Sequence, residues 1–233
     1  MKRVVVLTGA GISAESGIKT FRDADGLWEG HDVLEVATPE AFAKNPSLVL
    51  EFYNQRRKQL LEVSPNKAHH NLMALEEYFE VQIITQNIDD LHERAGSKNV
   101  LHLHGELLKV RSTKNPSEIL EWKKDLKLGD LCKYNSQLRP HIVWFGEEVP
   151  MLEKAIELTE KADILIIIGT SMQVYPAASL VHYVQRNTPI YFIDPNPKIS
   201  ANQFSNLTII DELASKGTHI LNELLIQNKR ATK

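Results

Sequence analysis

The first residues that could do chemistry form a glycine-rich stretch near the N-terminus. Gly9, Ala10 and Gly11 follow a β-branched run, and Ser13 and Gly17 come soon after them. Because glycine lacks a Cβ, backbone N–H groups can approach a phosphate there, and the helix that follows offers its dipole to the anion. The spacing favours a pyrophosphate cradle, although an ordinary tight turn between a strand and a helix has the same pattern.

Three further polar or glycine clusters follow apolar runs that are typical of buried strands. They are residues 86–90, 104–106 and 169–171. Ligands bind outside the carboxyl ends of strands in an open α/β sheet, so we expect all four clusters to meet in one crevice. This convergence favours a nucleotide-type ligand. Taken alone, residues 86–89 are better explained as a polar turn that caps a helix at Leu91.

His102 and His104 lie one alternation apart on one predicted strand. His104 is a candidate general base, although it could also be a satisfied core histidine, and His102 is the other candidate for the base. As a pair they could begin a metal site, but no carboxylate or cysteine is spaced to complete it. The remaining histidines that we considered are expected at the surface or in helix caps. They are His69, His70, His92 and His141.

The elements that must position these clusters alternate between strands and helices. We expect strands at residues 4–7, 81–85, 100–103, 142–145, 164–168 and 189–193. We expect helices at residues 46–61, 67–79, 150–161, 175–186 and 211–226, the first capped by Asn45. Apolar strands between helices predict an α/β fold with a parallel sheet covered on both faces. Residues 107–139 have poor periodicity and are typical of an inserted lobe.

Composition bounds the class of protein. The chain has 233 residues, 42% of them hydrophobic and 24% charged, which suits one α/β domain. A net charge of −3 gives no argument for a nucleic-acid or membrane partner. The single cysteine excludes an internal disulfide and indicates a reducing compartment. The longest apolar run is too short to cross a bilayer, and no signal peptide is expected, so we predict a cytoplasmic protein.

Taken together, the motifs resemble those of the sirtuin family. The matching segments, in family order, are 9–17, 20–22, 86–89, 104–105, 144–147 and 169–171. The resemblance implies an NAD-dependent protein lysine deacylase with a Rossmann-like large part at residues 1–28, 66–106 and 140–233. It implies a small lobe formed by two insertions, at residues 29–65 and 107–139.

The resemblance also implies which residues contact NAD. They are Gly9, Ala10, Gly11, Ser13, Gly17, Phe21, Arg22, Trp28, Gln86, Asn87, Ile88, Asp89, Gly169, Thr170, Ser171, Asp194, Asn196 and Ala214. Phe21 would shield the reactive sugar carbon from water. Ile88 and Asp89 would hold the nicotinamide carboxamide. Asp194 stands where the family usually has asparagine, so the affinity for NAD is expected to differ.

The resemblance assigns catalysis to His104 and Asn87. His104 would take a proton from the ribose hydroxyls, which lets the 2′ oxygen attack the imidate that the acyl-lysine forms. The products would be nicotinamide and O-acyl-ADP-ribose. A protein mono-ADP-ribosyltransferase and an NAD-binding pseudoenzyme remain alternative functions.

The expected substrate is an acyl-lysine peptide bound as an added strand beside Phe145, Gly146, Glu147 and Val174. Tyr53 and Arg56 lie three residues apart on one helix face and could clamp a carboxylate. From the residues alone, a solvated amphipathic helix explains them better. The resemblance to class III sirtuins, together with the small Ala37, instead implies a desuccinylase or demalonylase that could also deacetylate.

The chain departs from the family at its zinc site. Most sirtuins have two Cys-x-x-Cys pairs in the small lobe, but here Ser112 and Thr113 begin the first and only Cys132 remains of the second. One thiolate cannot form a tetrahedral zinc site, so we expect no zinc. Apolar packing is expected to hold the lobe, through Leu120, Trp122, Leu126, Leu128 and Leu131. We expect a monomer, although the sequence does not decide the oligomeric state.

Overall fold

A six-stranded parallel sheet forms the larger part of the protein. The structure is a computed structural model that describes residues 1–19, 27–28, 30–199 and 204–231. The strands are β1 (Arg3–Thr8), β4 (Glu80–Thr85), β5 (Val100–His102), β9 (Ile164–Ile168), β10 (Ile190–Ile193) and β11 (Leu207–Ile210). They lie in the order β11-β10-β9-β1-β4-β5, and every neighbouring pair is parallel. The predicted α/β fold with a parallel sheet is therefore confirmed.

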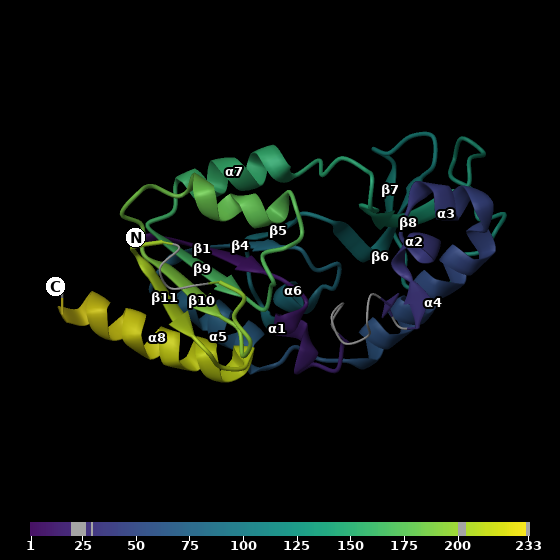
Figure 1. Cartoon of the computed structure of the whole chain (residues 1–233). Coiled ribbons are helices and arrows are strands. Elements are labelled where there is room, and N and C mark those ends of the chain that lie inside the picture. The colour runs from purple at the N-terminus through teal and green to yellow at the C-terminus, as the bar shows by residue number, and fades with distance from the viewer. Residues whose placement is uncertain (20–26, 29, 200–203, 232–233) are drawn as a thin grey trace.

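Helices cover both faces of this sheet (Figure 1). On one face lie α5 (Lys67–Leu75) and α8 (Ala214–Ala231), which pack against side chains of β1, β4 and β9. On the other lie α7 (Leu152–Glu160) and the 3-10 helix η1 (Ala177–Tyr183). All five residues of β9 are buried, as expected of an apolar strand enclosed on both sides. Two short helices, α1 (Gly11–Ala14) and α6 (Leu91–Ala95), follow the carboxyl ends of β1 and β4.

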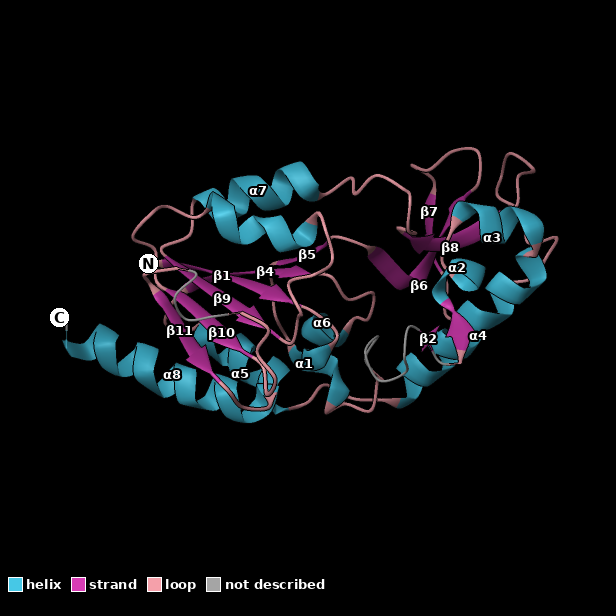
Figure 2. Cartoon of the chain, viewed as in Figure 1, coloured by secondary structure: helices cyan, strands magenta, loops and turns pink. Residues whose placement is uncertain are grey.

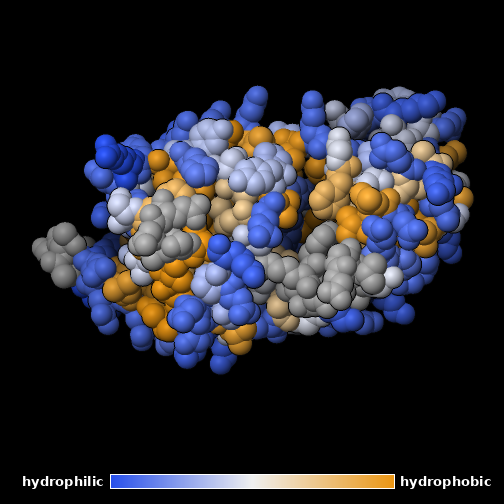
Figure 3. Space-filling view, in the orientation of Figure 1, coloured by the Kyte–Doolittle hydropathy of each residue, from blue (hydrophilic) through white to orange (hydrophobic). Residues whose placement is uncertain are grey.

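A smaller lobe lies beyond the carboxyl ends of the large sheet (Figure 2). Its three-stranded antiparallel sheet has the order β7-β6-β8, formed by β6 (Gly105–Ser112), β7 (Ile119–Glu121) and β8 (Leu138–Ile142). Its helices are α2 (Val33–Val36), α3 (Pro39–Lys44) and α4 (Pro46–Glu62), and β2 (Leu27–Trp28) pairs antiparallel with β3 (His31–Asp32). Figure 3 shows a hollow between the two lobes.

Helix α4 begins where the sequence predicted. The side chain of Asn45 accepts a hydrogen bond from Leu48 N at 3.2 Å, and Pro46 occupies the first turn. Arg57 on this helix is only 1% exposed, so the expected solvated face is wrong at that position. Its guanidinium donates to Leu107 O at 3.2 Å and to Asn54 Oδ1 at 2.8 Å. Burial lowers the pKa of Arg57 to about 10, which leaves it charged at neutral pH.

The apolar residues expected to hold the second insertion do so only in part. Leu126 is buried and Trp122 packs against its cluster, but Leu120, Leu128 and Leu131 are 40%, 55% and 49% exposed. Hydrogen bonds also stabilise the insertion, because the side chain of Asn54 accepts from Leu126 N at 2.8 Å and donates to Leu126 O at 3.0 Å. The insertion is thus fastened to α4 by a buried amide.

Several predicted boundaries were wrong. Residues 142–145 do not rejoin the large sheet, because β8 ends at Ile142 and pairs with β6 of the small sheet. Residues 177–183 form a 3-10 helix rather than an α-helix, and α8 begins at Ala214 rather than at residue 211. The edge strand β11 was not predicted. In the described part of the chain, no helix combines the length and apolar character needed to cross a membrane.

Candidate active site

The turns that follow β1 and β9 pack directly against each other. Gly9 N donates to Ile168 O at 3.0 Å, and Gly11 N donates to Gly169 O at 2.8 Å. A Cβ on Gly11 would lie 2.6 Å from the Cα of Gly169, too close to be tolerated. These glycines therefore allow two backbones to meet. Their N–H groups bond to protein carbonyls, so the expected reason for the glycines, amides directed at a phosphate, is wrong for Gly9 and Gly11 in this structure.

This contact lies where the strand order reverses. From β1 the chain passes to β4 on one side and later returns to β9 on the other, which places a crevice at the carboxyl ends of the strands. Gln86 joins all three strand ends, because its N–H donates to Thr8 O at 2.9 Å and its side chain donates to Thr170 Oγ1 at 3.1 Å. The predicted convergence of the polar clusters is confirmed.

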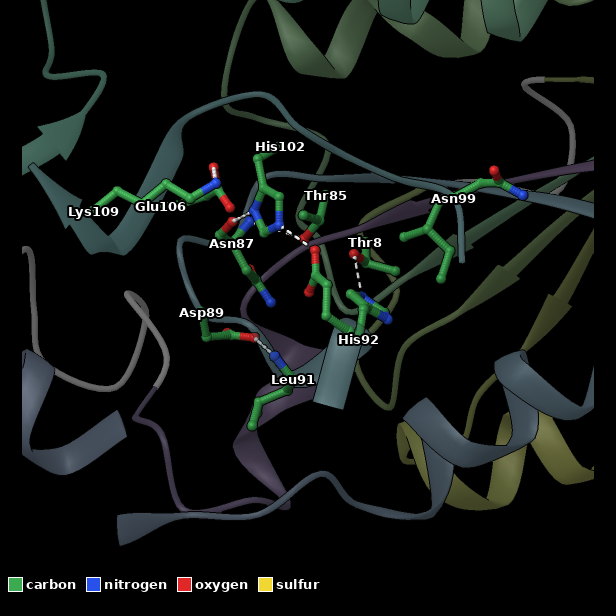
Figure 4. Close-up of polar contacts among 12 residues, drawn as sticks. Thr8, Thr85, Asn87, Asp89, Leu91, His92, Asn99, His102, Glu106 and Lys109 are labelled. Atoms are coloured by element: carbon green, nitrogen blue, oxygen red, sulfur yellow. Dashed lines mark hydrogen bonds and ion pairs between the residues drawn. The ribbon is translucent and has the colours of Figure 1, made fainter. Parts of the chain in front are cut away.

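Asn87, Asp89 and Ser13 form a hydrogen-bonded chain at this crevice. Asn87 Nδ2 donates to Ser13 Oγ at 3.1 Å and to Gly9 O at 3.2 Å. Ser13 Oγ in turn donates to Asp89 Oδ2 at 2.9 Å. Asp89 Oδ1 also accepts from Leu91 N, the first residue of α6, at 3.2 Å, so Asp89 contacts the start of α6 as well as bordering the crevice (Figure 4). Burial raises the pKa of Asp89 to about 6 despite these donors.

His104 is held by one ring nitrogen. Its Nδ1 lies 2.9 Å from Gln86 O, and since a carbonyl can only accept, Nδ1 carries the proton. Nε2 then has the lone pair, and within the described residues it has no hydrogen-bond partner. Burial lowers the pKa of His104, which keeps it neutral at pH 7. This is the protonation state that a general base needs.

His102 differs in that both of its ring nitrogens are engaged. Nδ1 lies 3.1 Å from Asn87 O and Nε2 lies 2.7 Å from Glu93 Oε1. His102 is therefore a poor candidate for the base. Among the residues that the structure describes, no three His, Cys, Asp or Glu side chains form a group that could hold a metal ion.

Two of the histidines expected at the surface or in caps are buried. His69 belongs to the capping box of α5, as predicted, because its Nδ1 accepts from Asn66 N at 3.3 Å. His92 contacts Thr8 Oγ1 through Nε2 at 3.1 Å, and its ring centroid lies 4.9 Å from that of His69. The surface expectation was wrong for His92 because α6 turns this residue under the end of β1.

The expected peptide-binding segment lies against the smaller lobe. Phe145 N donates to Ala37 O at 3.0 Å, and Phe145 itself is 46% exposed. Gly146 has a positive φ of 88°, which forms the tight turn. Glu147 folds back within this turn, where Arg139 binds its carboxylate at 2.6 Å and Trp144 N donates to it at 2.8 Å. Through these contacts, Glu147 stabilises the turn of the expected peptide-binding segment.

The two residues of the expected carboxylate clamp lie one turn apart on α4. Tyr53 is fully buried, and burial raises its pKa, so the phenol stays neutral. Its oxygen accepts from Trp144 Nε1 at 3.0 Å. Arg56 is half-buried, with its guanidinium carbon 5.2 Å from the centroid of the Phe52 ring. Ala37 is buried in the same apolar cluster as Tyr53 and Trp144.

The remaining predicted residues lie around the large sheet. Asp194 follows β10, and its Oδ1 accepts from Asn196 N at 2.9 Å. Ala214 begins α8 and is buried in the core. Gly17 follows α1, and Ile88 O accepts from Leu107 N. After β9, Ser171 is half-buried and Val174 is 38% exposed. Phe21 and Arg22 lie outside the described residues, as does the side chain of Trp28.

Sequence reasoning missed Glu15 and Glu93. Glu15 caps the N-terminus of α8, with Oε2 2.8 Å from Ser215 N. Glu93 binds His102. No local pattern could have found these pairs, because the partners of Glu15 lie 200 residues away and Glu93 resembles any exposed helical glutamate.

Comparison with known proteins agrees with this geometry. The Sir2 family model matches residues 9–176. An "NAD-dependent protein deacylase" of Helicobacter pylori (strain ATCC 700392 / 26695) is 61% identical over 225 residues, covering 97% of this chain and 96% of that protein. One from Bacteroides thetaiotaomicron is 54% identical, covering 97% and 99%. The solved structure of a Sir2 homologue in complex with NAD superposes with a TM-score of 0.86 at 42% identity, covering 98% and 91% of the chains. On these grounds the chain belongs to the Sir2 family.

Proposed function

We propose that this protein is an NAD-dependent protein lysine deacylase that prefers acidic acyl groups such as succinyl and malonyl. One observation carries the deacylase assignment: a neutral His104 presents an unprotonated Nε2 beside the crevice where β1, β4 and β9 end. The relatives that are 54–61% identical carry the name NAD-dependent protein deacylase. Their similarity over nearly the whole chain supports the same activity here.

The crevice offers suitable groups for NAD. Asp89 is buried yet retains acceptor capacity toward a carboxamide NH₂, because Ser13 Oγ donates to one of its oxygens and Leu91 N to the other, and each carboxylate oxygen can accept a second hydrogen bond. Thr170 and Ser171 follow β9 at the switch point, where ribose and phosphate groups bind in folds of this kind. When bound, NAD supplies a ribose carbon that loses nicotinamide and accepts the acyl oxygen.

The chain's own residues then do three things. Asn87 and Asp89 orient groups at the crevice, held by Ser13 and by the backbone N–H of Leu91. His104 Nε2 takes a proton from a hydroxyl, and Gln86 O stabilises the resulting imidazolium through Nδ1–H. The turn at residues 144–147 receives the peptide as an added strand, which gives affinity through backbone hydrogen bonds with little sequence preference.

The acyl preference rests on α4. Tyr53 and Arg56 place a phenol and a guanidinium one turn apart, and the small side chain of Ala37 lies in the same apolar cluster as Tyr53. A guanidinium binds a carboxylate through paired charge-assisted hydrogen bonds, which a neutral acetyl group cannot form. We therefore expect succinyl and malonyl groups to be removed faster than acetyl groups.

The experiment measures products by mass spectrometry from NAD and succinyl-, malonyl- and acetyl-lysine peptides. A deacylase yields O-acyl-ADP-ribose, an ADP-ribosyltransferase yields modified protein, and a pseudoenzyme yields neither. Arg56→Met should lower kcat/KM about 30-fold for the succinyl peptide, the size of one charge-assisted hydrogen bond, and about three-fold or less for the acetyl peptide. The exposed Arg186, changed to Met, is the matched control. Equal losses on both peptides would show that the clamp is wrong.

We expect the protein to work as a zinc-free monomer in the cytoplasm. The lone Cys132 supports the absence of zinc, because a structural zinc site needs four ligands. A small lobe formed by the two insertions 29–65 and 107–139 is consistent with the positions of α2–α4 and β6–β8.

A further inference from the structure

Two histidines hold consecutive carbonyl groups of the loop that follows β4. His104 Nδ1 binds Gln86 O at 2.9 Å, and His102 Nδ1 binds Asn87 O at 3.1 Å. His102 is the last residue of β5, and His104 lies two residues further on, in the bend that precedes β6. Figure 4 shows His102 directed at Asn87 from the end of β5. Two successive carbonyl groups of the loop backbone therefore each accept a hydrogen bond from a histidine.

The protonation of the two ring nitrogens of His102 can be inferred from their hydrogen-bond partners. Asn87 O can only accept, so Nδ1 carries a proton. The hydrogen bond and charge of His102 lower the pKa of Glu93 despite burial, so Glu93 is a carboxylate and Nε2 also carries a proton. Burial lowers the pKa of His102, but Glu93 outweighs it and the net direction is upward. Both ring nitrogens of His102 thus face acceptors, which favours the imidazolium, whereas burial favours the neutral form of His104.

We propose that His102, locked by Glu93, is a positioning residue that holds the backbone of Asn87 and thereby sets the geometry of the His104 base. The proposal rests on the function proposed above and deepens it. Gln86 links the two histidines, because its carbonyl fixes the tautomer of His104 and the next carbonyl is the one that His102 binds. A shift of the 86–87 peptide would move Nε2 of His104 away from its target.

The charge of His102 acts on the same site. Across the loop, the imidazolium lowers the pKa of Asp89, while Asp90 raises it. From the neighbouring elements, Glu93 on α6 and Glu106 on β6 face His102, and Lys109 pairs with Glu106 at 2.7 Å. Removal of the imidazolium should therefore move the ionisation of Asp89 to higher pH.

Two variants separate the two hydrogen bonds of His102. An asparagine amide reaches about as far as Nδ1 and can still donate to Asn87 O, whereas a glutamine amide reaches about as far as Nε2 and can still donate to Glu93. We expect His102→Gln to lower kcat about ten-fold or more, because small displacements of catalytic groups are costly. We expect His102→Asn to stay within about three-fold of the parent, with KM for the peptide little changed in both.

His219 provides the matched control. It pairs with Glu223 at 3.7 Å on the exposed face of α8, so His219→Gln removes a histidine–glutamate pair far from the crevice and should leave kcat unchanged. Melting temperatures identify any variant that fails to fold. In both His102 variants, the fall of kcat on the acidic side of the pH profile should occur about half a pH unit higher, because Asp89 loses a nearby positive charge.

Nitrogen NMR of the imidazoles tests the proposal without any turnover. At pH 7, His102 should be protonated on both nitrogens and His104 on Nδ1 alone. In the His102→Gln variant, we expect His104 to populate both neutral tautomers instead of one. If wild-type protein makes no O-acyl-ADP-ribose, the proposed function fails while this assignment can still hold. The proposal is overturned if His102→Gln keeps the parent kcat, if both variants lose kcat and thermal stability equally, or if His102 is neutral.

Discussion

Trp144 donates its indole N–H to the phenol oxygen of Tyr53 at 3.0 Å, inside a cluster where both side chains are buried. The bond connects α4 to the segment that carries Phe145, so the phenol cannot move without the turn. Because Trp144 supplies the donor, the phenol proton points elsewhere. The same bond that stabilises the lobe therefore orients one half of the proposed carboxylate clamp.

Replacement of Tyr53 by phenylalanine tests this double role. Tyr53→Phe leaves the indole N–H of Trp144 buried without its acceptor, which should lower the free energy of unfolding by about 1–3 kcal/mol. It should also lower kcat/KM for a succinyl peptide more than for an acetyl peptide. Urea denaturation and product assays measure the two effects. The control Tyr134→Phe, at a residue that is 62% exposed, should change neither. Unchanged stability would mean that the indole finds another partner.

Asp89 should make the protein less stable as pH rises from about 4 to about 6. Its folded pKa of about 6 lies above the ordinary value of 3.8 because burial disfavours the carboxylate. The folded state therefore holds the proton more tightly than the unfolded state, and this contribution is complete below pH 4 and lost above pH 6. The shift corresponds to about 3 kcal/mol.

Asp89→Asn should remove this pH dependence. At pH 7 the variant should be about 2 kcal/mol more stable than the parent, and near pH 4 the two should be alike. Asn can still accept from Leu91 N, and its amide can donate to Ser13 Oγ. Deacylation should fall, since a carboxylate is lost at the crevice. Urea titrations from pH 4 to 7.5 give the slopes, with exposed Asp211→Asn as control. A variant whose slope matches the parent would contradict the burial argument.

The parts of the fold that the sequence predicted have local causes. The strands β1 and β9 are β-branched runs, and α4 begins at an Asn-Pro cap. The meeting of the polar clusters was also predictable, because it follows from the common direction of parallel strands. These features depend on residues close in sequence or on topology alone.

The parts that could not be predicted depend on distant partners. Arg57 reads as a surface residue, yet it is buried because Leu107 O, 50 residues away, accepts from it. His102 and His104 look equivalent in the sequence, and only the position of Glu93 on α6 engages the second ring nitrogen of His102 while Nε2 of His104 stays available as a base. β8 joins the small sheet because its partner β6 begins at Gly105, which no periodicity indicates.

Chelation should leave this protein intact, because its small-lobe turns are closed by hydrogen bonds. Ser112 Oγ accepts from Lys114 N and Asn115 N, both at 3.2 Å, and Cys132 Sγ accepts from Tyr134 N at 3.4 Å. Metal analysis should find less than about 0.1 zinc per chain, and EDTA should not change the melting temperature. One zinc per chain, or a large fall on chelation, would refute this prediction. A zinc-finger protein treated in parallel controls for the chelator.

Glu15 should stabilise α8 from the opposite end of the chain. Its carboxylate accepts from Ser215 N at 2.8 Å and from Ser215 Oγ at 2.5 Å, at the helix end where negative charge is favourable. Asn71 on α5 then bonds Thr218 Oγ1 at 3.0 Å, so the capped first turn is also the turn that packs against α5.

Glu15→Ala should therefore cost about 1–2 kcal/mol of unfolding free energy, and Glu15→Gln, which keeps an acceptor but loses the charge, about half as much. Hydrogen exchange should speed up first at the amides of Ser215 and its neighbours, because the cap satisfies them directly. Glu212→Gln is the matched control, since Glu212 pairs with the exposed Lys216 on the same turn and surface pairs contribute little. Equal losses for Glu15→Gln and Glu212→Gln would mean that Glu15 acts as one more surface charge, and α8 would then depend on its apolar face alone.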